Sequence, residues 1–165
     1  MIHEDLEKRK TRKILEKYVK PEMAEKILNG DLEDFLRMKA VRIEFILIFV
    51  DGKSPEEISE RIAKAMKITM SQDACIEHLV GQLIFATFGG VHPITPPPRD
   101  RASLVERLRK GFPSHIKIVH GVADGYWGNV GCETRMSCTS ILPEFNAILG
   151  LLSRLEFGQI EEFRK

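Results

Sequence analysis

The stretch GNVGCETRMSCTSILPEFN, residues 128–146, carries the pattern that decides the fold. Its opening glycines bracket an Asn-Val pair, and this composition is typical of a tight turn. Polar and apolar residues then alternate, which predicts a strand with one buried face. A proline follows just before an apolar run, as at the start of many helices. The stretch therefore predicts a turn, an edge strand and a helix start in close succession.

The composition of the whole chain is typical of a soluble globular domain. Of its 165 residues, 43% are apolar and 30% are charged. The net charge of +1 gives no electrostatic reason to expect binding to nucleic acid or to an anionic membrane. No apolar run reaches the roughly 18 residues of a membrane span, and the N-terminus lacks the apolar region of a signal peptide. We therefore expect a cytoplasmic protein.

Two local features have an ordinary explanation. The chain has three cysteines, Cys75, Cys132 and Cys138, without the paired spacing of a metal site, so free thiols are expected. A redox role for Cys132 or Cys138 stays open. The basic segment at residues 7–13 reads as the solvated face of a helix, with a docking patch as the alternative.

Upstream of the opening stretch, the pattern predicts a helical extension and then a folded domain. Residues 4–18 favour a helix, but their apolar residues are too sparse for a well-buried one, so we expect a linker or dimer helix over residues 1–19. The main domain then covers residues 20–165. It begins with a short helix that has Pro21 at its first position and Gly30 after its end.

The main domain alternates helices with strands. Residues 40–50 predict a central strand stopped by Asp51-Gly52, and Ser54 with Glu57 caps the next helix. Gly81-Gln82 forms the turn of a β-hairpin. The remaining elements are a Pro-rich loop at 91–100, a helix at 101–112, a strand at 115–125 joined to a second at 126–131, and a last helix from 144. This order predicts an α+β fold with an antiparallel or mixed sheet, ferredoxin-like, with helices on one side.

Four motifs, in this order, resemble the catalytic domain of class III adenylate and guanylate cyclases. KYVKPEMAEKIL at 17–28 is similar to the family's RYVSPEVAE, and LIFVDG at 47–52 to LFADI. LVGQLIFATFG at 79–89 is similar to FIGDGVMAVFG. The stretch 128–146 aligns without a gap with GNVGSEERMDYTVIGDTVNLAARLE. Each motif alone is weak, but their order and spacing together indicate this family.

The resemblance implies a two-metal mechanism whose first residues lie on the strands. In the family, two aspartates hold two Mg²⁺ ions that bind the triphosphate and activate the ribose 3′-hydroxyl. The first aspartate aligns with Asp51 and the second with Gln82, which is neutral. A turn after the strand is also an ordinary explanation of Asp51-Gly52, and we favour it over a metal ligand. The purine-reading lysine aligns with His78, which also suits a hairpin residue facing solvent or a partner.

The other side of the implied site lies on the last helix. The purine-reading aspartate aligns with Pro143, and the ribose-binding asparagine with Asn146. The arginine that stabilises the transition state aligns with Gly150. Arg154, one turn further along, leans back toward that position and is a vestigial substitute. The family's phosphate-binding loop after the first aspartate is also missing, because DGKSPEEI at 51–58 leads directly into a helix.

The sequence thus predicts a degenerate cyclase domain that acts as a regulatory or scaffolding dimer in signalling. The resemblance implies a head-to-tail homodimer, with a protein partner or small-molecule ligand in the cleft between subunits. No cofactor is expected, and Mg²⁺ or Mn²⁺ would be needed for any remaining activity. Two alternatives stay open: a weak or altered metal-dependent cyclase, and a ferredoxin-like binding module only distantly related to cyclases.

Overall fold

The computed structural model describes residues 2–16, 21–30, 37–88, 101–132 and 135–164. The chain divides into two compact units, one made of Met1–Met38 with Gly128–Cys138 and the other of Lys39–Trp127 with Thr139–Lys165. The expected boundary between residues 19 and 20 stays a prediction. The Pro-rich loop expected at 91–100 lies outside the described residues.

The smaller unit contains two helices, α1 (Ile2–Leu15) and α2 (Pro21–Asn29). Pro21 opens α2, and Gly30 follows it with a φ of +79°, a conformation that glycine adopts without strain. Both predicted helices are therefore confirmed, although α1 ends at Leu15 rather than at residue 18. The same unit includes the end of β4 and the start of β5.

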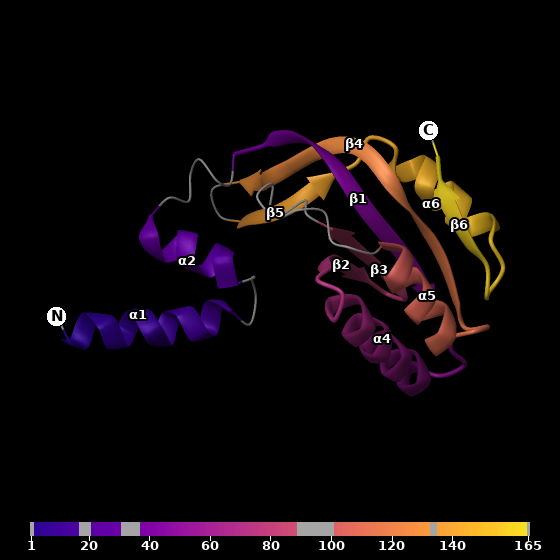
Figure 1. Cartoon of the computed structure of the whole chain (residues 1–165), viewed down its shortest axis with the longest axis horizontal. Coiled ribbons are helices and arrows are strands. Elements are labelled where there is room, and N and C mark those ends of the chain that lie inside the picture. Colours follow the sequence, from indigo (N-terminus) through magenta and orange to yellow (C-terminus); the bar gives the residue numbers. More distant parts are fainter. Residues whose placement is uncertain (1, 17–20, 31–36, 89–100, 133–134, 165) are drawn as a thin grey trace. The chain divides into compact units, whose positions relative to one another are not determined.

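The larger unit is built around a β-α-β-β-α-β core (Figure 1). Its elements are β1 (Lys39–Val50), α4 (Pro55–Met70), β2 (Cys75–Val80), β3 (Leu83–Phe88), α5 (Arg101–Gly111) and β4 (Ile116–Cys132). The strands lie in the order β2-β3-β1-β4-β5, and β1 is antiparallel to both β3 and β4. The ferredoxin-like order predicted from the sequence is confirmed.

Three further elements follow the core. The edge strand β5 (Arg135–Ile141) continues the sheet beyond β4, and α6 (Phe145–Arg154) follows it, as the opening stretch predicts. A last short strand, β6 (Ile160–Phe163), pairs with β4 in parallel and makes the sheet mixed. The sequence analysis did not predict β6, because four residues with two glutamates show no clear strand pattern.

The central strand β1 is apolar on both faces, and helices cover both. Ile46, Ile48 and Val50 pack with residues of α4 and α5, among them Leu104 and Leu108. The intervening residues Ile43, Phe45 and Leu47 pack on the other face with Ile148 and Leu152 of α6. The sequence predicted helices on one face of the sheet only, and α4 and α5 do lie on one face. A strand with apolar residues of both parities needs cover on its second face as well, and α6 supplies it.

β4 is one continuous strand rather than the two joined strands expected at 115–125 and 126–131. Its pairing with β1 runs without interruption from Ile116 opposite Val50 to Trp127 opposite Lys39. Glycine at position 125 therefore does not mark a turn. A Cβ at that position would lie 2.5 Å from the Ile141 carbonyl oxygen, so close strand packing explains the residue.

A cluster of charged side chains lies where α5, β1, β4 and β6 meet. Arg101 of α5 lies 3.4 Å from a carboxylate oxygen of Glu44 and 3.0 Å from one of Glu162. His120 of β4 stands opposite Glu162 in the sheet. Burial lowers the pKa of His120, the positive charge of Arg101 lowers it further, and Glu162 acts in the opposite sense.

We expect this histidine to make the fold less stable in mild acid. Because the fold disfavours protonated His120, the unfolded chain binds more protons, and stability falls as the pH drops below the unfolded-state pKa of about 6.5. Urea unfolding of the wild type and His120→Gln at pH 7.5 and 5.5 measures this effect. The wild type should lose more stability between the two pH values than the variant does. Equal losses would show that His120 does not contribute.

Among the described residues, every helix is too short or too polar to span a bilayer.

Candidate functional site

The turn after β1 fixes the main chain of Asp51 from two sides. Its N–H donates to the His115 carbonyl oxygen (2.7 Å), and its own carbonyl oxygen accepts a hydrogen bond from Arg61 Nη1 (2.7 Å). Arg61, on α4, also forms an ion pair with Glu57. A guanidinium group therefore lies beside the residue that aligns with the family's first metal ligand, and its positive charge opposes cation binding there.

The start of α4 confirms the predicted cap. Ser54 Oγ accepts a hydrogen bond from the Glu57 N–H (3.2 Å). The Glu57 carboxylate reaches back to the Lys53 N–H (2.7 Å), and this hydrogen bond, together with the charges of Arg61 and Lys53, lowers its pKa. Gly52 is required by close packing, because a Cβ there would lie 2.4 Å from Cγ1 of Ile58. These contacts are those of a tightly packed turn.

Gln82 lies directly beside this turn and serves as a hydrogen-bond donor. Its Nε2 donates to the Val50 carbonyl oxygen (2.9 Å), while the Val50 N–H donates to the Gln82 carbonyl oxygen (3.0 Å). An ionised carboxylate has no proton to donate in this position. The structure thus brings Asp51 and Gln82 together. Of these two residues, only Asp51 carries a carboxylate.

This arrangement does not fit a pair of Mg²⁺ ions. Magnesium binds through one or two protein carboxylates together with substrate phosphates, and the resemblance implies two aspartates for the two ions. Here the Gln82 amide hydrogen points at Val50, and Arg61 lies beside Asp51. Within the described part of the chain, no three His, Cys, Asp or Glu side chains gather in a way that would hold a metal ion.

His78, on the hairpin strand β2, contacts β5 at the opposite edge of the sheet. Its Nε2 lies 2.6 Å from Thr139 Oγ1. The imidazole ring stacks on Phe85, with ring centroids 6.2 Å apart, and Phe85 meets Phe145 of α6 edge-on at 5.7 Å. His78, which aligns with the family's purine-reading lysine, is therefore engaged with other residues of the same chain.

Glu77, beside His78, holds the two edge strands together. Its carboxylate accepts hydrogen bonds from Thr87 Oγ1 (2.6 Å), from both the N–H and Oγ of Ser140 (2.7 Å each), and from Thr139 Oγ1 (3.3 Å). We call Glu77, Thr87, Thr139 and Ser140 the edge clasp. The sequence analysis missed Glu77. A signal was present, because the adjacent polar residues Glu77 and His78 break the alternation of β2, and the pairing of β2 with β3 shifts register at that point.

The candidate residues on α6 are not brought together. Asn146 and Arg154 are both exposed on α6 and lie more than two turns apart, about 12 Å along the axis. Gly150 lies between them, and a Cβ added to it would meet no atom within 4 Å. Pro143 is exposed ahead of α6. The role of Arg154 as a substitute for an arginine at position 150 stays a prediction.

Replacing Gly150 with alanine should stabilise the protein. The position is in the middle of a helix and has open space for a methyl group, so only the helix propensity changes. We expect a gain of about 0.5–1 kcal/mol in the free energy of unfolding. Urea denaturation of the two proteins measures it. A loss of stability would mean that position 150 is needed as glycine for packing.

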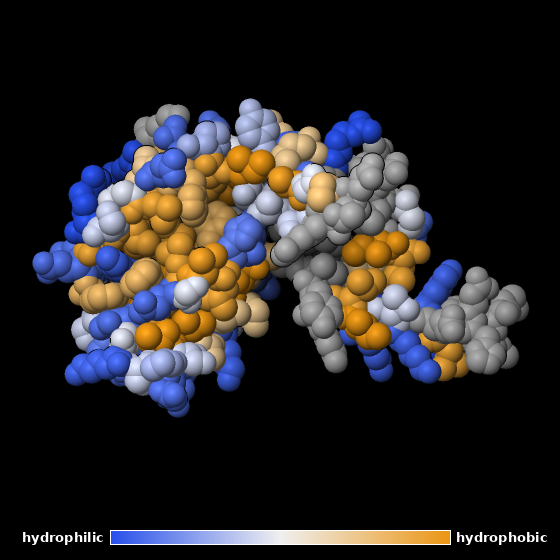
Figure 2. All heavy atoms as spheres, turned by 180° about the vertical axis from the view of Figure 1, so that it is seen from behind, coloured by the Kyte–Doolittle hydropathy of each residue, from blue (hydrophilic) through white to orange (hydrophobic). Residues whose placement is uncertain are grey.

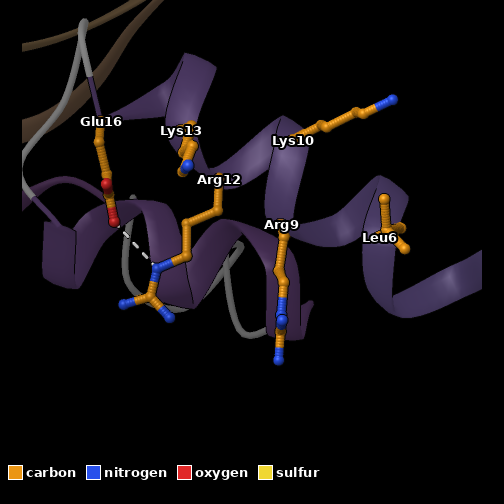
Figure 3. A pocket seen from close by; sticks show the side chains of 6 residues that line it. All are labelled: Leu6, Arg9, Lys10, Arg12, Lys13 and Glu16. Atoms are coloured by element: carbon orange, nitrogen blue, oxygen red, sulfur yellow. Dashed lines mark hydrogen bonds and ion pairs between the residues drawn. The ribbon is translucent and has the colours of Figure 1, made fainter. Parts of the chain in front are cut away.

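A separate hollow of about 670 Å³ lies along α1 (Figure 3). Its described lining is Leu6, Arg9, Lys10, Arg12, Lys13 and Glu16. Arg12 pairs with Glu16 at 2.9 Å. The hollow is strongly basic, as expected of this segment, and its described lining includes none of the residues singled out by the cyclase resemblance.

Among the described residues, the cysteines and histidines do not gather into a metal site. Cys75 is half-buried and Cys132 is exposed. A redox role for Cys132 or Cys138 stays open. His115 precedes β4, and His120 lies within it next to Arg101.

Solved structures with the same fold are catalytic domains of adenylyl and guanylyl cyclases. The catalytic core of a rhodopsin-guanylyl cyclase with converted specificity, in complex with ATPαS, matches with a TM-score of 0.61 and 12% identity over 76% of this chain and 79% of that one. The adenylyl cyclase CyaB from P. aeruginosa matches with a TM-score of 0.51 and 19% identity over 75% and 78%.

A non-canonical dimeric guanylyl cyclase domain of the RhoGC fusion protein from Blastocladiella emersonii matches with a TM-score of 0.51 and 11% identity over 76% and 80%. No protein-family model matches the sequence, and no curated protein is significantly similar to it. The chain therefore has the fold of the class III nucleotide cyclase catalytic domain.

Proposed function

We propose that this cyclase-fold domain does not form cyclic nucleotides and acts as a regulatory or scaffolding dimer in signalling. The observation that carries the proposal is that two family site positions are engaged within the protein. Gln82 donates to Val50, and His78 contacts Thr139. Both groups would have to leave these partners before they could bind a metal or a base.

Residues on α6 support the same proposal. The transition-state arginine of the family is replaced by Gly150, and Arg154 lies a turn away. Comparable arginines in other phosphoryl-transfer enzymes contribute about 10³–10⁵-fold in rate. A site without this charge, and with one carboxylate instead of two, lacks the main sources of transition-state stabilisation in such reactions.

An assay of product formation tests the loss of catalysis. The purified chain is incubated with ATP or GTP, with Mg²⁺ or Mn²⁺, and cyclic nucleotide is quantified by mass spectrometry beside an active cyclase domain. We expect no product above the protein-free control. Turnover that disappears in Asp51→Ala would overturn the proposal and favour the alternative of a weak metal-dependent cyclase. The presence of Asp51 and Asn146 supports that alternative.

Exposed apolar side chains on the edge strands support a dimer. Leu79 (47% exposed) and Val80 (68%) lie on β2, and Ile141 (42%) lies on β5, the strand that His78 contacts. Figure 2 shows that apolar side chains gather over a broad area of the larger unit. Exposed apolar areas of this kind mark interaction sites. One of the similar cyclase domains is itself dimeric.

Sedimentation of the wild type and two variants tests this part of the proposal. Val80→Glu places a charge among these side chains and should shift the protein toward monomer. Met70→Glu is the matched control, since Met70 is 56% exposed but lies at the end of α4 and not on an edge strand. A wild type that is monomeric at all concentrations, or a dimer equally weakened by both variants, would contradict a dimer formed through the edge strands.

A further inference from the structure

A hollow of about 360 Å³ lies on the β1–β4 part of the sheet, within the larger unit. Its lining includes Ala40, Arg42, Asp124, Gly125, Tyr126 and Pro143. The size is within the range of small-molecule sites, about 300–1,000 Å³. Asp51, Gln82 and Asn146 do not line it, whereas Pro143, which aligns with the family's purine-reading aspartate, does.

The strand register determines which groups face this hollow. Arg42 stands directly opposite Asp124, and Ala40 stands opposite Tyr126, so these side chains project from one face of the sheet. Tyr126 is 47% exposed, whereas its neighbour Trp127 is buried, as expected for adjacent strand residues. The small side chain of Ala40 leaves room between the charged groups and the phenol ring.

Arg42 and Asp124 carry opposite charges on directly opposed residues, yet they do not pair. Among the described residues, neither side chain makes an ion pair or hydrogen bond, with the other or with any third group. Both are exposed. One guanidinium and one carboxylate are thus presented side by side with their hydrogen-bonding capacity unused.

We propose that this hollow binds a small zwitterion of the amino-acid class, with an aromatic side chain. Arg42 would donate two hydrogen bonds to the ligand carboxylate through its planar pair of N–H groups, and Asp124 would accept hydrogen bonds from the ligand ammonium group. The exposed ring of Tyr126 and the ring of Pro143 provide the apolar surface for an aromatic body. The proposal is independent of whether the domain forms cyclic nucleotides.

Titration with L-phenylalanine tests it, followed by NMR of the backbone amides. We expect saturable shifts centred on Ala40, Gly125 and Tyr126. Phenethylamine lacks the carboxylate and 3-phenylpropionate lacks the ammonium group. Each should bind about tenfold more weakly than L-phenylalanine, since each loses one charge-assisted interaction.

Two variants assign the ligand groups to their protein partners. Arg42→Gln should weaken L-phenylalanine about tenfold and leave phenethylamine unchanged, whereas Asp124→Asn should weaken L-phenylalanine and leave 3-phenylpropionate unchanged. Arg109→Gln, an exposed arginine on α5, is the matched control and should change nothing. The proposal is overturned if L-phenylalanine causes no saturable shifts, if the three compounds bind equally, or if Arg42→Gln and Asp124→Asn behave like the control.

Discussion

Replacing Glu77 with alanine should lower the free energy of unfolding by about 3 kcal/mol, the largest effect we expect from a single polar side chain here. Its carboxylate accepts four hydrogen bonds, at 2.6–3.3 Å, from Thr87, Thr139 and Ser140. Hydrogen bonds to a charged group contribute about 1.5–3 kcal/mol each, and they are not additive. The loss also leaves the Ser140 N–H without its acceptor, which adds to the cost.

Urea denaturation of the wild type, Glu77→Ala and Glu77→Gln measures this effect. Glutamine keeps one oxygen acceptor but turns an NH₂ group toward the hydroxyl donors, so Glu77→Gln should lose about half as much stability. Glu161→Ala, at an exposed position on β6, is the control and should change stability by less than about 0.5 kcal/mol. A Glu77→Ala variant as stable as this control would mean that the edge clasp does not hold β2 to β5.

The order of elements up to α6 was predictable from local patterns, because each of them is marked by its own residues, whereas β6 is not. Gly30 and Gly81 take positive φ values of +79° and +56° at the positions where the sequence predicts a helix end and a hairpin turn. The continuity of β4 was not predictable, since Gly125 resembles a turn residue. Its small size is required by a strand neighbour distant in sequence, and no local pattern shows such a contact.

The sequence predicted which residues form the candidate site but not which hydrogen bonds they make. The resemblance identified Asp51, Gln82 and His78 as family positions, and the structure places Gln82 beside the Asp51 turn. That Gln82 donates to Val50, or that His78 meets Thr139 at 2.6 Å, depends on how the sheet curls to bring its edges together. Pairings of this kind join residues about 30 and 60 positions apart, beyond the reach of periodicity.

Replacing Gln82 with glutamate should destabilise the protein by about 2 kcal/mol near pH 7 and should not create a metal site. The change keeps the size of the side chain and removes the donor that now bonds to the Val50 carbonyl oxygen at 2.9 Å. The carboxylate of the Gln82→Glu variant would face the Val50 carbonyl oxygen, which can only accept hydrogen bonds. It would also lie close to Asp51, the residue that follows Val50. An unsatisfied or repelled polar group of this kind costs about 1–3 kcal/mol.

Thermal unfolding of Gln82→Glu, with and without 10 mM Mg²⁺ or Mn²⁺, distinguishes two effects of the substitution. One is the loss of the amide hydrogen-bond donor, and the other is the gain of a carboxylate that could bind a metal ion. Gln82→Met is the matched control, because it removes the hydrogen bond without adding charge. A cation that bound only the folded variant would stabilise it by about 2.7 kcal/mol at 100 times its Kd. We expect neither cation to raise the melting temperature of Gln82→Glu relative to Gln82→Met, because Arg61 stays beside Asp51. A selective rise would show that one carboxylate is all that separates this turn from a working metal site.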